Sequence, residues 1–190
     1  MKIYTRTGDK GQTRIIGKTI VDKDDTRVEA YGSVDELNSW VGMTISLLTP
    51  KTAVMKPELE EIQQLLFDAG RDLATLKSDT RHDFIFSKLN DGATDWLEKK
   101  IDDYTAKVPP VNKFILPGGT QPASALQYAR TVTRRAERRI VSLQKNDASN
   151  NDVLIFINRL SDYFFAAARY ANFLDSYDDI LYRNSRPVFR

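Results

Sequence analysis

The sequence contains no cysteine and a single histidine, His82, and these two shortages exclude several kinds of chemistry. Without cysteine there is no disulfide framework, no thiolate zinc site, no iron–sulfur cluster and no cysteine nucleophile. With one histidine, His-rich metal sites, paired Glu-x-x-His di-iron bundles and most Ser-His-Asp arrangements are excluded as well. Function must therefore come from arginine, lysine, acids, asparagine, hydroxyls and the backbone.

Long apolar runs and a charge imbalance are also lacking. No stretch approaches the roughly 20 apolar residues that a membrane-spanning helix needs, and no apolar signal core follows the first residues, so we expect a cytoplasmic location. The 28 Lys+Arg and 26 Asp+Glu leave a net charge of +2, which does not point to a nucleic-acid-binding protein. A local basic patch remains compatible with that balance.

Hydrophobic periodicity predicts an all-α protein with one domain over residues 1–190. Residues 1–32 carry few helix signals and are expected to form an arm, in which 2–5 and 13–16 could be short strands around a turn at 8–11. The helical bundle is expected over 33–176 and a tail over 177–190. Within the bundle, four or five helices are predicted, at about 33–49, 57–73, 94–108, 121–145 and 152–174.

Local signals set some of these boundaries. Ser33, with Glu36 three residues later, fits a capping box that would start the first helix. The polar stretch 77–92, which includes His82, is expected to be a surface loop. We find no internal repeat and no linker that would divide the chain.

The arm contains a segment suited to phosphate. Residues 5–13 combine two glycines with threonines and cations, which offer N–H groups, hydroxyls and positive charge to phosphate oxygens. The spacing is not that of a Walker A motif. An ordinary solvated turn remains the alternative, because short glycine-rich loops are weak signals.

The helix at 121–145 carries an arginine-rich stretch over residues 130–139. At about 100° per residue, Arg130, Arg134 and Glu137 share one narrow arc beside the apolar face, so this arc should be half-buried, while Arg135 and Arg139 point elsewhere. Arginine suits bidentate recognition of oxyanions. Ion pairs three or four residues apart along a solvated helix, and a nucleic-acid-binding stripe, remain open as alternatives.

The last helix is apolar nearly all round, which is typical of the centre of a bundle. It also carries a polar stripe, formed by Asn158, Ser161, Asp162, Arg169 and Asn172. Buried polar groups without partners cost about 1–3 kcal/mol each, so the stripe should meet internal partners, a ligand or a subunit interface. Phe114 precedes a Pro-Gly-Gly breaker and could pack in the core or contact a flat apolar ligand.

Five motifs in this order resemble those of the ATP:cob(I)alamin adenosyltransferases of the propanediol-utilisation type, and of lactobacillal members in particular. They lie at residues 5–11, 31–38, 114–119, 134–138 and 157–162. The resemblance implies an enzyme that moves the 5′-deoxyadenosyl group of ATP to the cobalt of cob(I)alamin, giving adenosylcobalamin and triphosphate. It also implies a homotrimer of five-helix bundles with an active site at each subunit interface. A helical ATP- or polyphosphate-binding protein without transfer activity is the alternative.

The resemblance implies a role for each site residue. Arg130 and Arg134 would contact the phosphates or the ribose, and Glu137 and Asn158 would hold the nucleoside. Asp35 would pair with Arg130 across the interface, and Phe114 would lie under the corrin and help to exclude its lower axial base. The triphosphate would be wrapped by the arm residues Thr5, Arg6, Thr7, Gly8, Asp9, Lys10, Gly11 and Thr13, with Lys18 reaching it too.

Cofactors and partners follow from the same resemblance. Mg²⁺ is expected on the ATP phosphates, with no ligand from protein side chains. A flavin-dependent reductase is a candidate partner and a bacterial microcompartment a candidate location, whereas no nucleic acid or membrane partner is expected. Because Co(I) is itself a strong nucleophile, the protein needs no nucleophile of its own, only alignment and stabilisation of the departing triphosphate. The lack of cysteine and histidine is consistent with that requirement.

Overall fold

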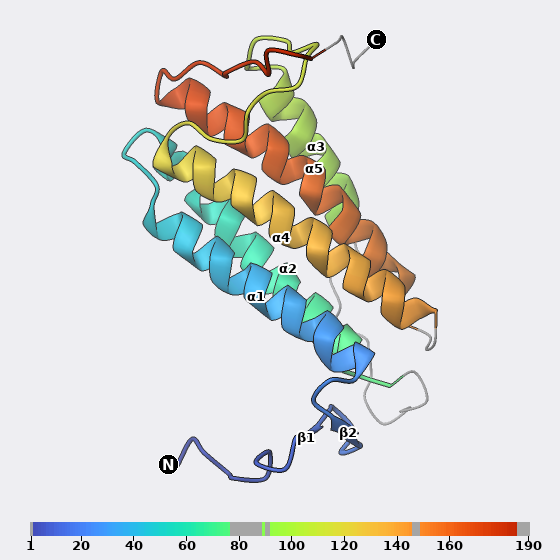
Figure 1. Ribbon diagram of the computed structural model, residues 1–190. Helices are drawn as coiled ribbons and strands as arrows, with labels where there is room; N and C mark the ends of the chain where they lie inside the picture. Colours follow the sequence, from blue (N-terminus) through green and yellow to red (C-terminus); the bar gives the residue numbers. More distant parts are fainter. Residues whose placement is uncertain (1, 77–88, 90–91, 146–148, 186–190) are drawn as a thin grey trace.

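The computed structural model describes residues 2–76, 89, 92–145 and 149–185, and these residues form a bundle of five α-helices with a small hairpin at one end (Figure 1). The predicted all-α, five-helix architecture is confirmed. The helices are α1 (Thr26–Ser46), α2 (Lys56–Leu73), α3 (Ala93–Thr105), α4 (Gln121–Gln144) and α5 (Asn151–Leu174), with a 3₁₀ turn η1 (Thr52–Met55) before α2. His82 and nearly all of the predicted loop 77–92 lie outside the described residues.

The apolar faces of the helices meet in one core. Helix α4 packs against both α1 and α5, while α2 packs on α1 and α3 on α5. As its composition predicts, α5 contributes large aromatic side chains to that core, and Phe156, Tyr163 and Phe164 are fully buried. Within the described residues, no helix is long and apolar enough to cross a membrane.

The predicted start of α1 at Ser33 is wrong. The helix begins at Thr26, where the side chain of Asp25 accepts a hydrogen bond from the Arg27 amide over 2.7 Å, and Ser33 lies inside the helix with its hydroxyl bonded to the Glu29 carbonyl. The apolar pattern did not reveal these extra turns, because the buried residue there is the charged Arg27. Its guanidinium donates to the carbonyls of Leu73 and Thr75 at the end of α2. The arm therefore ends at Asp25 rather than at residue 32.

The predicted strand pairing in the arm is also wrong. Strand β1 (Gln12–Arg14) pairs antiparallel with β2 (Ile20–Asp22), whereas residues 2–5 form no strand. The chain reverses between the strands at Gly17 and Lys18, which both adopt left-handed φ angles, of 92° and 72°. Residues 8–11 do turn, as predicted, with the Gly11 amide bonded to the Gly8 carbonyl. The error arose because residues 8–11 and residues 17–18 both contain turn-forming glycine, and only the second turn joins the two strands.

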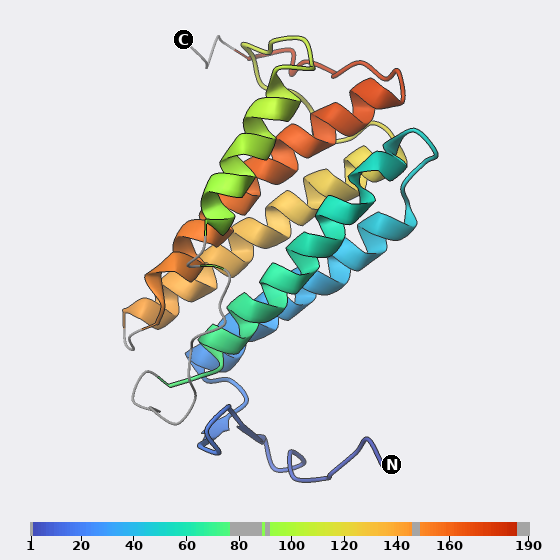
Figure 2. The same ribbon diagram turned by 180° about the vertical axis from the view of Figure 1, so that it is seen from behind.

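The arm and the loop that carries Phe114 lie at opposite ends of the bundle (Figures 1 and 2). The arm joins the bundle where α1 begins and α2 ends, through a hydrogen bond from the Ile16 amide to the Ala74 carbonyl. At the other end, the segment between α3 and α4 pairs with the chain that follows α5, through an antiparallel bridge between Ile115 and Leu181. No local signal in the sequence indicates this pairing.

A buried acidic group connects three helices. The carboxylate of Glu58 on α2 accepts hydrogen bonds from the hydroxyls of Tyr104 on α3 and Tyr163 on α5, over 2.8 and 2.6 Å. Lys100 on α3 completes the cluster with a 2.6 Å ion pair to the same carboxylate. Burial, followed by the charge of Glu58, raises the pKa of both tyrosines, so their hydroxyls stay protonated and continue to donate.

We predict that Glu58→Ala lowers the free energy of unfolding by about 2–4 kcal/mol, because it leaves two buried hydroxyls and the Lys100 ammonium without their acceptor. Denaturant titration at fixed protein concentration measures this. Glu60→Ala is the control, since it removes only an exposed ion pair with Lys56 and should change the stability by less than about 1 kcal/mol. Equal losses in the two variants would contradict the account.

Candidate active site

Two arginines without an acidic partner occupy one face of α4. Arg130 is half-buried and Arg134 is exposed, and among the described residues neither forms an ion pair. The Nε of Arg130 donates instead to the neutral side chain of Gln127, over 3.1 Å. Burial, followed by the charge of Arg134, lowers the pKa of Arg130. Because arginine stays protonated in proteins, two like charges repel here, and a bound anion would relieve them.

The neighbouring arginines are neutralised on the other side of the helix. Arg135 forms an ion pair with Glu36, and Arg139 forms one of 3.0 Å with Glu29, both across to α1. Five residues correspond to a rotation of about 140° around a helix, so Arg135 faces away from Arg130, as predicted. The alternative of ion pairs along α4 is therefore wrong for Arg135 and Arg139, because both arginines pair with acids of α1 instead. It does not account for Arg130 and Arg134.

Polar groups from α4 and α5 meet beside the arginine pair. The side-chain amide of Asn158 donates to Glu137 over 2.8 Å, which joins the two helices one turn from Arg134. Both side chains remain accessible, so further donors and acceptors are available there. Arg130, Arg134 and Glu137 thus share one face of α4, as their helical spacing suggested, and Asn158 joins Glu137 from α5 to form an outer α4/α5 face.

The predicted arm residues lie away from this face. Thr5 and Thr7 are joined by a 2.9 Å hydrogen bond between their hydroxyls. Most of the arm residues that were predicted to bind are exposed. The exposed ones are Thr5, Arg6, Thr7, Asp9, Lys10, Gly11 and Lys18, whereas Gly8 and Thr13 are half-buried. Within one chain, the arm joins the bundle at the end of α2, where the Ile16 amide donates to the Ala74 carbonyl.

Asp35 also lies away from Arg130 in the single chain. It is exposed at a groove of about 350 Å³ between α1 and α2, beside Tyr31 and Phe67. The next residue, Glu36, faces α4 and pairs with Arg135. Because Asp35 faces α2 and Arg130 faces away from α1, one chain cannot join the two residues.

Phe114 lies in the loop at the far end of the bundle, and its side chain is 57% exposed. Core packing, one of the two alternatives for this residue, is therefore wrong. Leu116, also about half exposed, lies two residues further along the same paired segment. Since side chains two apart on a strand point to the same side, the loop presents an apolar surface suited to a flat ligand.

Gln127 is a site residue that the sequence reasoning missed. It is almost fully buried, and its side-chain oxygen orients the guanidinium of Arg130. The signal was present, because Gln127 precedes Arg130 by three residues and so lies on nearly the same side of α4.

Comparison with known proteins identifies the family. The family model described as cobalamin adenosyltransferase matches residues 3–171. The chain belongs to the cobalamin adenosyltransferase family. It is 50% identical to the corrinoid adenosyltransferase of Bacillus subtilis over 192 aligned residues, which cover 100% of this chain and 96% of that one. It is 41% identical to the human corrinoid adenosyltransferase MMAB, over 98% of this chain and 75% of that one.

Solved structures of this family share the fold closely. A variant PduO-type ATP:corrinoid adenosyltransferase from Lactobacillus reuteri, complexed with cobalamin and ATP, matches with a TM-score of 0.95 and 66% identity over 99% of this chain and 100% of that one. Another variant of the same protein, complexed with ATP, gives a TM-score of 0.91 and 65% identity over 96% of this chain and 100% of that one. The resemblance noted in the five sequence motifs is confirmed.

We predict that inorganic triphosphate raises the thermal midpoint of the protein, because a ligand that binds only the folded state stabilises it. The rise should disappear in Arg134→Met, which removes half of the unpaired cationic cluster. Arg139→Met is the matched control, since Arg139 is already neutralised by Glu29, and it should keep the rise. Differential scanning fluorimetry over a triphosphate titration measures this, and a full rise in Arg134→Met would refute the anion site.

Proposed function

We propose that this adenosyltransferase, which transfers the 5′-deoxyadenosyl group of ATP to the cobalt of cob(I)alamin, holds ATP on the outer α4/α5 face. The observation that carries this assignment is the pair of unneutralised arginines, Arg130 and Arg134, beside the Glu137–Asn158 hydrogen bond. The guanidinium groups would bind the phosphates or the ribose by bidentate hydrogen bonds. Glu137 and Asn158 would hold the nucleoside.

The reaction needs positioning more than acid–base chemistry. An electron pair on Co(I) attacks C5′ of ATP, the C5′–O bond breaks, and the triphosphate leaves with the bonding pair. Negative charge therefore accumulates on the leaving group, where preorganised cations stabilise the transition state. Arg130 and Arg134 supply such cations on a rigid helix, and the substrate itself supplies the nucleophile.

The arm would close over the triphosphate from a second copy of the chain. Its glycines, threonines and cations suit phosphate, but within one chain the arm projects from the end of the bundle where α1 begins. Asp35 likewise lies in the α1/α2 groove, away from Arg130 of the same chain. A homotrimer in which the arm and Asp35 of one subunit meet α4 of the next would complete the site and pair Asp35 with Arg130.

Phe114 would provide the apolar contact with the corrin. Its exposed ring could occupy the lower face of the substrate and help to exclude the axial base there. Removing an axial ligand makes the cobalt easier to reduce to Co(I), which is the harder part of the reaction. A flavin-dependent reductase in the cytoplasm or in a bacterial microcompartment would deliver the electron.

Mg²⁺ would arrive on the phosphates of ATP. Among the described residues, no cluster of three acidic, histidine or cysteine side chains could hold a metal ion. Mg²⁺ prefers few protein ligands together with substrate phosphates and water, so this donor set is compatible with a metal carried by ATP. Bound there, the ion would neutralise part of the triphosphate charge beside the arginines.

The direct test incubates the protein with ATP, Mg²⁺ and chemically reduced cobalamin without oxygen. We expect the absorption spectrum to change to that of adenosylcobalamin, with Arg134→Ala lowering kcat/KM for ATP by roughly 100-fold or more. ATP binding with no spectral change would instead identify a binding protein without transfer activity.

Phe114→Ala should reduce turnover far more than it changes the KM for ATP, because the ring is assigned to the corrin and not to the nucleotide. Steady-state kinetics with each substrate varied in turn measure the two effects. Wild-type turnover in this variant would remove Phe114 from the proposed site.

Subunit mixing tests the shared site. Asp35→Ala and Arg134→Ala chains should each be poorly active alone, yet chains co-expressed as mixed oligomers should regain activity, since about a quarter of interfaces then combine two intact halves. Mixed Arg130→Ala and Arg134→Ala chains are the control, because both changes fall in the same half. No recovery in the first mixture would contradict an interfacial site.

A further inference from the structure

The loop that carries Phe114 is held by the chain that follows α5, here called the tail segment (residues 177–185). The Leu116 amide donates to the Ile180 carbonyl over 2.7 Å, and the Tyr182 amide donates to the Phe114 carbonyl over 2.8 Å. The Phe114 amide donates to the Ser185 hydroxyl over 2.9 Å. Both backbone polar groups of Phe114 are therefore bonded to the tail segment, while its ring is left exposed.

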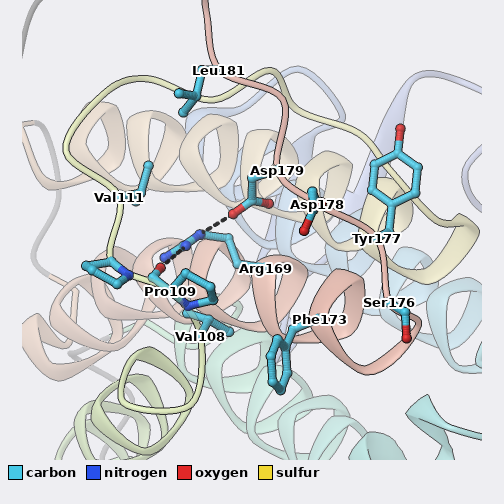
Figure 3. Close-up of a pocket in the computed structure, with 11 residues that line it drawn as sticks. Val108, Pro109, Val111, Arg169, Phe173, Ser176, Tyr177, Asp178, Asp179 and Leu181 are labelled. Atoms are coloured by element: carbon cyan, nitrogen blue, oxygen red, sulfur yellow. Dashed lines mark hydrogen bonds and ion pairs between the residues drawn. The ribbon is translucent and has the colours of Figure 1, made fainter.

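An ion pair anchors the tail segment to the bundle. The Nε of Arg169 on α5 donates to the Asp179 carboxylate over 2.7 Å, and the other end of the same guanidinium donates to the Pro109 carbonyl over 2.6 Å. The Arg169 side chain is only 7% exposed. Figure 3 shows this guanidinium reaching from α5 to both segments, at a cleft of about 590 Å³. One buried cation thus fixes the start of the Phe114 loop and the strand that pairs with it.

The other end of the loop is clamped by Asn172, one turn further along α5. Its side-chain amide donates to the Gly118 carbonyl over 3.1 Å, and its oxygen accepts from the Thr120 amide over 3.0 Å. Gly119 permits this close approach, because a Cβ atom there would lie 2.1 Å from the Asn172 oxygen, and its φ of 114° suits glycine. The polar stripe of α5 therefore has internal partners at Arg169 and Asn172, and those partners are the two ends of one loop.

We propose that Asp179, bound to Arg169, is a positioning residue for the corrin-side reaction: it fixes the tail segment and thereby the exposed ring of Phe114. The inference rests on the role of Phe114 given under the proposed function. A loop with an exposed aromatic ring has little packing of its own to fix that ring. Its position is instead determined by the strand pairing, and Asp179 adjoins Ile180, the first residue of that pairing.

The matched variants are Asp179→Asn and Asp178→Asn, which remove the same charge from adjacent residues. Asp178 is exposed, and the ion pair of Arg169 is made by Asp179. Asp179→Asn should lower kcat/KM for cobalamin roughly 10-fold, as expected for a small displacement of a substrate contact, while the KM for ATP is unchanged. Hydrogen exchange at the Leu116 and Tyr182 amides should accelerate. Asp178→Asn should behave as wild type in each measurement.

A double-mutant cycle with Phe114→Ala separates positioning from general stability. If Asp179 acts through Phe114, adding Asp179→Asn to Phe114→Ala should cost less than about twofold, because coupled residues do not add. Losses that multiply fully, or wild-type cobalamin kinetics in Asp179→Asn, would overturn the inference. Wild-type kinetics in Phe114→Ala would instead overturn the proposed role of Phe114 itself.

Tyr182→Pro provides a second variant, in case Asp179→Asn folds poorly with Arg169 left unpaired. It deletes the N–H that bonds to the Phe114 carbonyl, together with a half-exposed phenol ring, in a segment away from the core. The same cobalamin-specific loss is expected. An unchanged kcat/KM for cobalamin in this variant would contradict positioning by the tail segment.

Discussion

The proposed function depends on two like charges, Arg130 and Arg134, which have no acidic partner among the described residues. The fold neutralises the arginines on one side of α4 with acids of α1 and leaves these two, on the other side, with a neutral amide as their neighbour. Such an arrangement costs stability in the isolated chain, since like charges four residues apart on a helix destabilise it. Under the proposed function, the triphosphate of ATP supplies the negative charge that this face of the helix lacks.

Under the proposed function, a single bundle holds only parts of the site. The arginines lie on the outer α4/α5 face, the phosphate-suited arm leaves the bundle at one end, and the Phe114 loop lies at the other (Figures 1 and 2). A second copy brings its arm to the arginines, so that bound ATP neutralises the arginines and contacts both subunits. In the same proposal, the tail segment positions the ring of Phe114 against cobalamin, the second substrate.

The sequence predicts the bundle well, because the apolar periodicity of α2, α4 and α5 is long and regular. It also predicts how the arginines of α4 divide, since that division follows from about 100° of rotation per residue. It fails at the start of α1, where a buried Arg27 interrupts the apolar pattern while making its own bonds to the end of α2. The pairing of residues 114–116 with the tail segment is a long-range contact, and no local spacing or turn signal reveals it.

One measurement tests the shared site most directly, and the lack of cysteine makes it simple. Ile3→Cys chains, altered in the exposed arm, are co-expressed with Val141→Cys chains, altered one turn beyond Glu137 on α4, and treated with a short thiol cross-linker. We predict a covalent link between the two chains whose yield rises with MgATP, as the arm closes over the bound triphosphate. Chains that carry both cysteines are the comparison. If these form an internal link while the singly altered chains form none, with or without MgATP, a site shared between subunits is contradicted.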